Sequence, residues 1–298
     1  MKRILILGNR GYIGSALCDF IKHNTGYLLG REWSLTGIDL NLFPTDNNYS
    51  LPLDYNTLSE DYISRYDVVI MLGGISSAPY CKQNPQESYK ANVTDFVNLV
   101  NKLPNGCKFI YASSASVYGL SGSIPQTEQD TLKPPVSPYD HQKQFLDVYS
   151  ALNLRDIQYY GLRFGTVCGY SGTPRNELLL NAMTRASKLD GVVRVSSPDS
   201  YRAVLYMQDL IRAILCIITQ NKPKGIYNLC SFNTKIGDLG NAVAKLLNVP
   251  LVIDETNTSL YSFTMDTTKF INTYNFEFSG NIENIVQDCL KNNFNIVR

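Results

Sequence analysis

This 298-residue chain contains little histidine, no closely spaced cysteines and almost no net charge. It contains only His23 and His141, and no two of its seven cysteines lie close together in the sequence. A histidine-rich metal site is therefore excluded, and the cysteines lack the short spacing of a zinc site. We expect no bound metal, reduced thiols, and consequently a cytoplasmic location.

An excess of one charge and long apolar runs are also lacking. Lysine and arginine number 27 against 26 acidic residues, so nothing indicates a nucleic acid or a membrane surface as a partner. The longest apolar runs are about seven residues, too short to span a bilayer. The run at 4–7 is too short for a signal peptide, and we interpret it as part of a buried strand.

A glycine-rich turn follows that first strand. The apolar run Lys2–Leu7 predicts a strand buried on both faces, and a helical pattern begins at Ile13. Glycines between a strand and a helix let backbone N–H groups approach a pyrophosphate at the helix N-terminus. The spacing is Gly-x-x-Gly-x-x-Gly rather than Gly-x-Gly-x-x-Gly. We predict that a dinucleotide is bound here by Gly8, Arg10, Gly11, Tyr12, Ile13 and Gly14.

Asp39 lies near the end of a second predicted strand, at 35–40. An acid at this place accepts hydrogen bonds from the adenosine ribose and repels a 2′-phosphate, so it favours NAD as the cofactor. Arg10 argues in the other direction, because its side chain has the length to meet a 2′-phosphate, and NADP stays open as an alternative. We interpret the segment 23–33, which precedes this strand, as a surface loop.

Strands and helices alternate along the first half of the chain. This alternation predicts an α/β fold with a Rossmann-type doubly wound parallel sheet. The strands are expected at 2–7, 35–40, 51–53, 67–72 and 107–112, with a long helix at 85–103. Further candidate cofactor contacts near these elements are Asp54, which would meet an adenine edge, Gly73, Gly74 and Asn92.

A cluster of hydroxyl groups in the run Ser113–Gly119 follows the fifth of these strands. At the carboxyl end of a parallel strand such groups face the ligand crevice. A proline-rich loop then leads to a predicted helix with Ser137 as its N-cap and Pro138 in its first turn.

Tyr139 and Lys143 are four residues apart in that helix, which places both side chains on one face. A phenol ordinarily has a pKa of about 10. An ammonium group held close, together with a positively charged nicotinamide, would favour the phenolate. We expect the pKa of Tyr139 to be lowered toward about 7, which would make the residue an acid/base for a sugar hydroxyl.

Taken together, these motifs resemble those of the extended short-chain dehydrogenase/reductase family. The likeness is strongest to its nucleotide-sugar epimerase branch, typified by UDP-galactose 4-epimerase. The interval of 25 residues from Ser114 to Tyr139 agrees with the epimerases. The matching positions extend over nearly the whole chain and comprise Gly8, Gly11, Gly14, Asp39, Asn92, the run 109–119, Tyr139, Lys143 and Leu162-Arg163-Phe164.

The resemblance implies a role for each reactive residue. Tyr139 would exchange a proton with the sugar hydroxyl while hydride passes to NAD, and Ser114 would hydrogen-bond the same sugar oxygen. Lys143 would stabilise the phenolate and hold the nicotinamide ribose. The implied reaction is epimerisation of a nucleotide sugar through a transient keto intermediate. The family also implies a homodimer, formed by the apolar faces of the helices at 90–103 and 140–152.

The second half of the chain supplies the substrate side. Arg202–Leu210 resembles the family's Arg-x-x-x-His-Val-x-Asp segment, in which the arginine binds a diphosphate. Ala115 and Ser116 stand where 4,6-dehydratases carry an acidic pair and decarboxylating relatives a glutamate, so both activities are disfavoured. Thr166 replaces an asparagine of the 4-epimerases, and 259–265 lacks a second phosphate-binding arginine, so the sugar and the nucleotide stay open. The candidate substrate contacts are Ser76, Ser114, Ser116, Thr166, Arg175, Asn181 and Arg202.

Two lobes and three functions are consistent with the sequence. Residues 1–165 are expected to form the NAD-binding domain, with a strand and helix at 204–219 returning to it, and 166–298 the substrate lobe. The leading function is the epimerase. The alternatives are an NAD(P)H-dependent reductase or dehydrogenase of a nucleotide-linked keto sugar, and a non-catalytic dinucleotide-binding sensor. The intact set of reactive residues argues against the sensor.

Overall fold

The structure is a computed structural model that describes residues 2–28, 33–40, 50–254 and 261–295. Its larger lobe is built on a seven-stranded sheet in which every neighbouring pair of strands is parallel. The strand order is β11-β7-β5-β4-β1-β2-β3, which confirms the predicted doubly wound α/β fold. The strands are β1 (Lys2–Leu7), β2 (Trp33–Asp39), β3 (Ser50–Pro52), β4 (Val68–Met71), β5 (Lys108–Ser114), β7 (Gln158–Phe164) and β11 (Gly225–Leu229).

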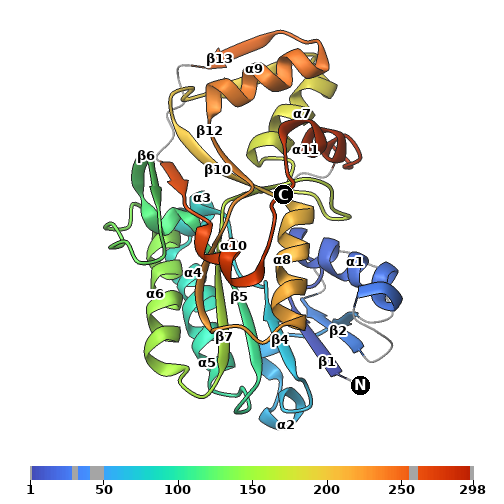
Figure 1. The fold of residues 1–298 in the computed structure, drawn as a ribbon, viewed down its shortest axis with the longest axis vertical. Helices are drawn as coiled ribbons and strands as arrows, with labels where there is room; N and C mark the ends of the chain where they lie inside the picture. The colour runs from blue at the N-terminus through green and yellow to red at the C-terminus, as the bar shows by residue number, and fades with distance from the viewer. Residues whose placement is uncertain (1, 29–32, 41–49, 255–260, 296–298) are drawn as a thin grey trace.

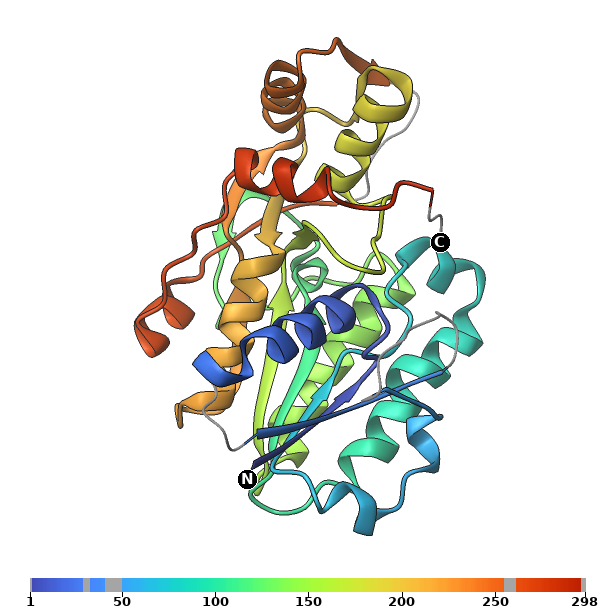
Figure 2. The ribbon, with the colours of Figure 1, turned by 90° about the vertical axis from the view of Figure 1, so that its right-hand side faces the viewer.

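Helices cover both faces of this sheet, so the larger lobe has three layers (Figures 1 and 2). The first strand is apolar from Ile4 to Leu7 because both of its faces are covered there: Ile4 and Ile6 belong to the apolar cluster on one face, and Leu5 and Leu7 to the cluster on the other. The first cluster includes residues of α1 (Tyr12–Leu28) and α8 (Met207–Thr219), and the second includes residues of α5 (Asp95–Val100) and α6 (Pro138–Asn153).

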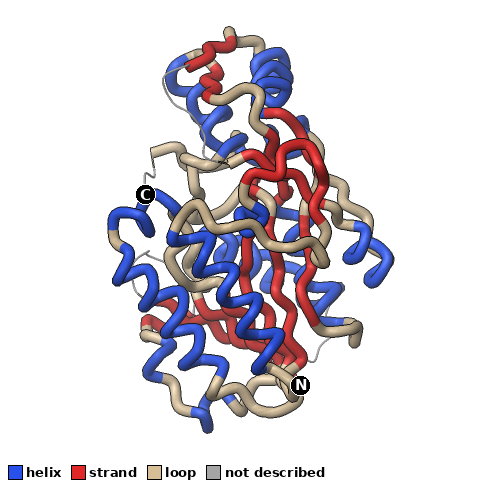
Figure 3. Tube along the Cα trace, turned by 90° about the vertical axis from the view of Figure 1, so that its left-hand side faces the viewer, coloured by secondary structure: helices blue, strands red, loops and turns tan. Residues whose placement is uncertain are grey.

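The smaller lobe lies beyond the carboxyl ends of the large sheet, at the top of Figure 1. Its helices pack around a separate apolar cluster. A further strand pair, β6 (Leu120–Gln126) with β14 (Ser262–Met265), lies beside the larger lobe (Figures 1 and 3). Further elements are a sheet of β8 (Thr166–Cys168), β10 (Tyr201–Tyr206) and β12 (Phe232–Lys235), and the pair β9 (Val193–Ser196) and β13 (Leu251–Asp254). Further helices are α2 (Glu60–Ile63), α3 (Ala78–Gln83), α7 (Leu179–Asp190), α9 (Ile236–Leu247), α10 (Thr268–Tyr274) and α11 (Ile282–Cys289).

The prediction of a surface loop at 23–33 is wrong for the first part of this segment, because α1 continues through His23 to Leu28. Lys22 and His23 lie on the exposed side of this helix, and residues 29–32 of the expected loop lie outside the described residues. The expected helix at 85–103 is interrupted: α4 (Pro85–Tyr89) is followed by a π-helical turn at 90–94, and α5 ends at Val100.

The strand expected to return to the large sheet near Val204 does not do so. It is β10, which pairs with β8 and β12 in the smaller lobe, whereas the helix after it, α8, packs on the large sheet. The proline-rich segment is expected to be a loop, but it contains the strand β6. Pro125 is tolerated there because β6 pairs only with β14 and is an edge strand. Within the described ranges, no helix has both the length and the apolar character needed to cross a membrane.

Candidate active site

A cavity of about 820 Å³ opens where the carboxyl ends of β1, β4, β5 and β7 meet the smaller lobe. This position is where open parallel sheets bind their ligands, and the volume suits a small-molecule site. Most of the contacts predicted from the sequence line it, namely Gly8, Gly11, Tyr12, Ile13, Gly14, Asp39, Asp54, Gly73, Gly74, Ser76, Ser114, Ser116, Tyr139, Lys143, Thr166, Arg175 and Arg202.

The glycine turn is closely packed against itself and against the β4 loop. A Cβ atom on Gly8, whose φ is +85°, would lie 2.3 Å from the backbone N of Gly73. A Cβ on Gly14 would lie 2.1 Å from the carbonyl oxygen of Gly8. Two of the three glycines are therefore required by the shape of the turn itself. This shape brings the N-terminus of α1 to the cavity wall, where it can meet an anionic group.

Hydroxyl groups from the smaller lobe form hydrogen bonds with backbone carbonyl oxygens of the glycine turn. Thr173 Oγ1 donates to the carbonyl oxygens of Arg10 at 2.9 Å and Gly11 at 3.2 Å. Ser171 Oγ donates to the carbonyl oxygen of Tyr12 at 2.7 Å. The two lobes are thus joined directly at the predicted cofactor turn.

Asp39 lies beside this turn, and Arg10 is directed elsewhere. The carboxylate of Asp39 accepts the backbone N–H of Arg10 at 2.8 Å and lines the cavity. The guanidinium of Arg10 donates from Nε to Ser50 Oγ at 2.8 Å, and the side chain is outside the cavity lining. The acid that disfavours a 2′-phosphate is therefore in place, whereas the predicted contact from Arg10 is not found. Asp54 lines the cavity while it caps the turn after β3 by accepting the backbone N–H of Asn56 at 2.9 Å.

Asn92 and Asn181, two further predicted contacts, are buried outside the cavity lining and form hydrogen bonds with neighbouring segments. Asn92 accepts the backbone N–H of Ile75 at 2.7 Å and donates to Gln142 Oε1 at 2.7 Å. Asn181 donates to the hydroxyl of Tyr12 at 3.0 Å and accepts the N–H of Gly169 at 3.1 Å. Their amides therefore shape the cavity through its neighbouring segments.

Ser114, Tyr139 and Lys143 meet on one wall of the cavity. Ser114 closes β5, and its Oγ accepts the backbone N–H of Ser116 at 3.1 Å. Ser137 caps α6 by accepting the N–H of Asp140 at 3.2 Å, which places Tyr139 in the first turn of that helix. Lys143 lies one turn further along α6.

Burial shifts the pKa values of both Tyr139 and Lys143. Burial raises the pKa of Tyr139 to about 12, although the hydrogen bond with Ser114 and the positive charge of Arg175 act to lower it. Burial lowers the pKa of Lys143 to about 8, and the negative charge of Asp147 acts in the opposite direction. The protein's own charges therefore do not bring the pKa of the phenol near neutrality, and the expected value, which includes the charge of a bound nicotinamide, stays a prediction. Burial removes more stabilisation of the phenolate than the neighbouring charges restore.

Two arginines stand at the substrate end of the cavity. Arg175 donates from Nε to Glu177 at 2.6 Å and from a terminal nitrogen to Ser76 Oγ at 2.8 Å. Arg202 donates to the backbone carbonyls of Tyr201 and Tyr261, and burial lowers its pKa to about 10. Both arginines line the cavity, and a guanidinium group suits a phosphate or carboxylate.

Tyr261 and Phe263 also line the substrate end, and the sequence reading missed them. The hydroxyl of Tyr261 donates within the first turn of α6, where Ser137 Oγ lies at 3.0 Å and the carboxylate oxygens of Asp140 at 3.2 Å. The alternation of aromatic and polar residues from 261 to 263 is the available signal, because it predicts a strand with one face turned to a site.

The fold and this cavity define a class, the dinucleotide-dependent enzymes with a doubly wound sheet and a tyrosine–lysine pair. A family model described as "NAD dependent epimerase/dehydratase family" matches residues 4–230. The chain therefore belongs to the NAD-dependent epimerase/dehydratase family and is an enzyme of that family. This confirms the resemblance stated from the sequence and the prediction of NAD as cofactor.

One relative and two solved structures illustrate what this chain is similar to. Protein CapI of Staphylococcus aureus is 30% identical over 230 residues, which cover 71% of this chain and 68% of CapI. The structure of UDP-glucose 4-epimerase from Stenotrophomonas maltophila, with bound NAD and formylated UDP-arabinopyranose, has a TM-score of 0.81, 16% identity and coverage of 98% and 97%. The structure of TunA, an NAD-dependent NDP-hexosamine 5,6-dehydratase, has a TM-score of 0.83, 20% identity and coverage of 98% and 97%.

Proposed function

We propose that this protein is an NAD-dependent epimerase of a nucleotide-activated sugar, with Tyr139 as the acid/base. The observation that carries the proposal is the convergence of Ser114, Tyr139 and Lys143 on one wall of a cavity that runs from the glycine turn to Arg202. The residues that follow Ser114 are Ala115 and Ser116, so the acidic pair of the 4,6-dehydratases is missing from this position. That difference favours epimerisation over dehydration.

The residues of the cavity fit NAD. The N-terminus of α1 beside Gly11 would hold the pyrophosphate, and Asp39 would accept hydrogen bonds from the adenosine ribose. Asp54 would meet the adenine, and Lys143 the nicotinamide ribose. When bound, NAD supplies the hydride acceptor and a positive charge near the phenol.

The protein's own groups would move the proton and hold the sugar. Tyr139 would take the proton of the sugar hydroxyl and return it after the keto sugar has turned its other face. Ser114 would hydrogen-bond the same oxygen, and Lys143 would stabilise the phenolate by its charge. Because the protein alone leaves the pKa of Tyr139 at about 12, the phenol becomes an effective base only with a further cation close by. Arg202, together with Arg175, would bind the diphosphate at the other end.

The test is a screen of UDP-, GDP-, dTDP- and CDP-sugars with product analysis by NMR. We expect one sugar to be converted into its epimer, with no net change in absorbance at about 340 nm because NAD is regenerated. Net consumption of added NADH with a keto sugar would establish the reductase instead. Binding of NAD without turnover of any of these sugars would contradict the proposed function.

A further inference from the structure

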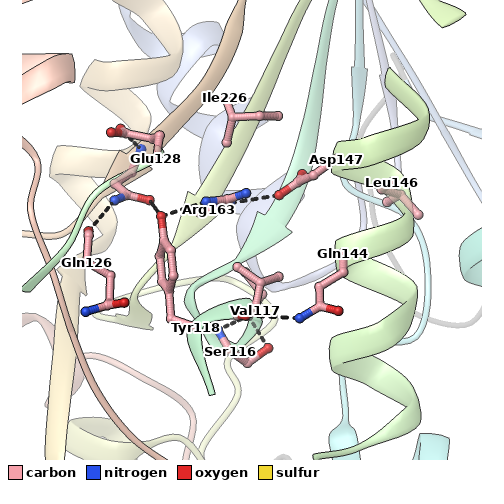
Figure 4. Close-up of polar contacts among 12 residues, drawn as sticks. Ser116, Val117, Tyr118, Gln126, Glu128, Gln144, Leu146, Asp147, Arg163 and Ile226 are labelled. Carbon is pink, nitrogen blue, oxygen red and sulfur yellow. Dashed lines mark hydrogen bonds and ion pairs between the residues drawn. The ribbon is translucent and has the colours of Figure 1, made fainter. Parts of the chain in front are cut away.

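Arg163 in β7 joins the two segments that carry the reactive residues (Figure 4). Its Nε donates to Asp147 Oδ2 of α6 at 2.8 Å, and its terminal Nη1 donates to the hydroxyl of Tyr118 at 2.7 Å. Arg163 is 4% exposed, Asp147 3% and Tyr118 0%, so solvent does not screen these contacts. The guanidinium is thus a buried bridge between the turn after β5 and the helix α6.

The partners of Arg163 stand one turn from the groups proposed to react. Asp147 follows Lys143 by four residues on α6, and Lys143 follows Tyr139 by four. Tyr118 closes the helical turn Ala115–Tyr118 that begins directly after Ser114. Arg163 therefore holds the far ends of both short segments, and the near ends carry Ser114 and Tyr139.

Other contacts make the bridge rigid. Gln144 of α6 donates to the carbonyl oxygen of Val117 at 3.1 Å, between the two segments (Figure 4). The second carboxylate oxygen of Asp147 accepts the hydroxyl of Tyr111 at 3.2 Å, so both of its oxygens are occupied. Lys143 Nζ donates to the carbonyl oxygen of Ala112 at 2.7 Å, which ties the same helix to β5.

Burying two charges costs desolvation free energy, so stability alone does not explain why the pair is charged. Apolar residues of similar size often replace a buried ion pair without loss of stability. We propose that Arg163 and Asp147 are positioning residues, which fix the separation of Ser114 from Tyr139 and supply the countercharge of Lys143. This inference rests on the proposed function and deepens it. The charged or titratable neighbours of Lys143 are Tyr139 and Asp147 on its own helix and Cys81 from the helix Ala78–Gln83.

The decisive variant is the double replacement Arg163→Met with Asp147→Leu, which removes both members of the buried pair together and so leaves neither of them without the other. We expect kcat to fall about 10- to 100-fold, with KM for the sugar identified in the NMR screen and the affinity for NAD unchanged. Arg163→Lys keeps the charge without the planar fork and should restore only part of kcat. A double variant that is folded and has wild-type kcat would overturn the inference, because the pair would then be purely structural.

A matched control is Lys108→Met at the opposite end of β5. Lys108 is also a buried cation, and its Nζ donates to the carbonyls of Ile217, Ile218 and Gln220 at the end of α8. We expect kcat of the folded variant to equal that of the wild-type protein. An equal loss of kcat in the control would also contradict a specific role of Arg163.

A second readout does not require turnover. In Asp147→Asn, the titration of Lys143 followed by ¹³C NMR of its ε carbon in the free protein should move to lower pH by about one unit. An unchanged titration of Lys143 would refute the proposal that Asp147 supplies its countercharge. If no sugar turns over in wild-type protein, the proposed function fails, and this titration still decides the inference about Asp147.

Discussion

The ammonium of Lys143 lies 5.7 Å from the ring centroid of Tyr139, and it donates its hydrogen bond to the carbonyl oxygen of Ala112. The pair that the sequence places on one helix face is therefore assembled, but the charge of Lys143 is directed first to the backbone of β5. This arrangement leaves burial as the main influence on the pKa of the phenol, which burial raises. It also defines what substitutions at the two positions should do.

Replacement of Tyr139 by Phe should abolish turnover while leaving the fold and NAD binding intact. The change removes only the hydroxyl that would exchange the proton, and a positioned acid/base is typically worth about 10²- to 10⁴-fold in rate. Steady-state kinetics with the sugar found by the screen, and calorimetric titration with NAD, make the measurement. Near-normal activity in the variant would refute the mechanism.

Lys143→Met should make the free protein more stable below pH 8. The pKa of Lys143 is lowered to about 8 from an ordinary 10.5, so the unfolded chain binds more protons between these pH values and stability rises with pH across that window. Below pH 8 the charged, buried Lys143 lowers the free energy of unfolding by its full amount, roughly 3 kcal/mol. Urea unfolding at pH 7 and 10 should show the advantage of the variant shrinking at the higher pH. A difference between the two proteins that does not depend on pH would contradict the assignment.

Gly8→Ala and Gly106→Ala form a matched pair. Both glycines have positive φ, +85° and +79°, so each alanine costs about 1 kcal/mol in backbone strain. Only Gly8 adds a clash, because its Cβ would lie 2.3 Å from Gly73 N, whereas a Cβ on Gly106 meets no described atom within 4 Å. We expect Gly8→Ala to lose NAD binding in calorimetry and to be the less stable variant. Equal effects of the two substitutions would show that the close packing of the turn is unimportant.

The proposed homodimer should depend on the outer face of α6. Val148 and Leu152 on this helix are 52% and 64% exposed, and a second copy would cover them. Val148→Glu with Leu152→Glu should give a monomeric mass by light scattering at micromolar concentration. Leu189→Glu on α7, 53% exposed in the other lobe, serves as the control and should leave the mass unchanged. A monomeric wild-type protein would reject the dimer itself.

Local spacing explains why much of the site was predictable. The strand–glycine turn–helix order, Asp39 at the end of the second strand, and Tyr139 four residues before Lys143 are all short-range patterns. Parallel strands bring their carboxyl ends to one edge, so these separate patterns converge without further information. Arg163 was visible only as part of a family motif, because its partner Asp147 lies 16 residues away on another element.

The sequence alone determined the doubly wound sheet and the glycine turn and supplied the candidate reactive residues, since each depends on periodicity or close spacing along the chain. Only the tertiary structure decided that Arg10, Asn92 and Asn181 stay outside the cavity lining and that the strand at Val204 joins the smaller lobe. It also decided that burial sets the pKa of Tyr139. Burial and partner choice depend on residues that are distant in the chain and close in space, and the order of residues does not state them.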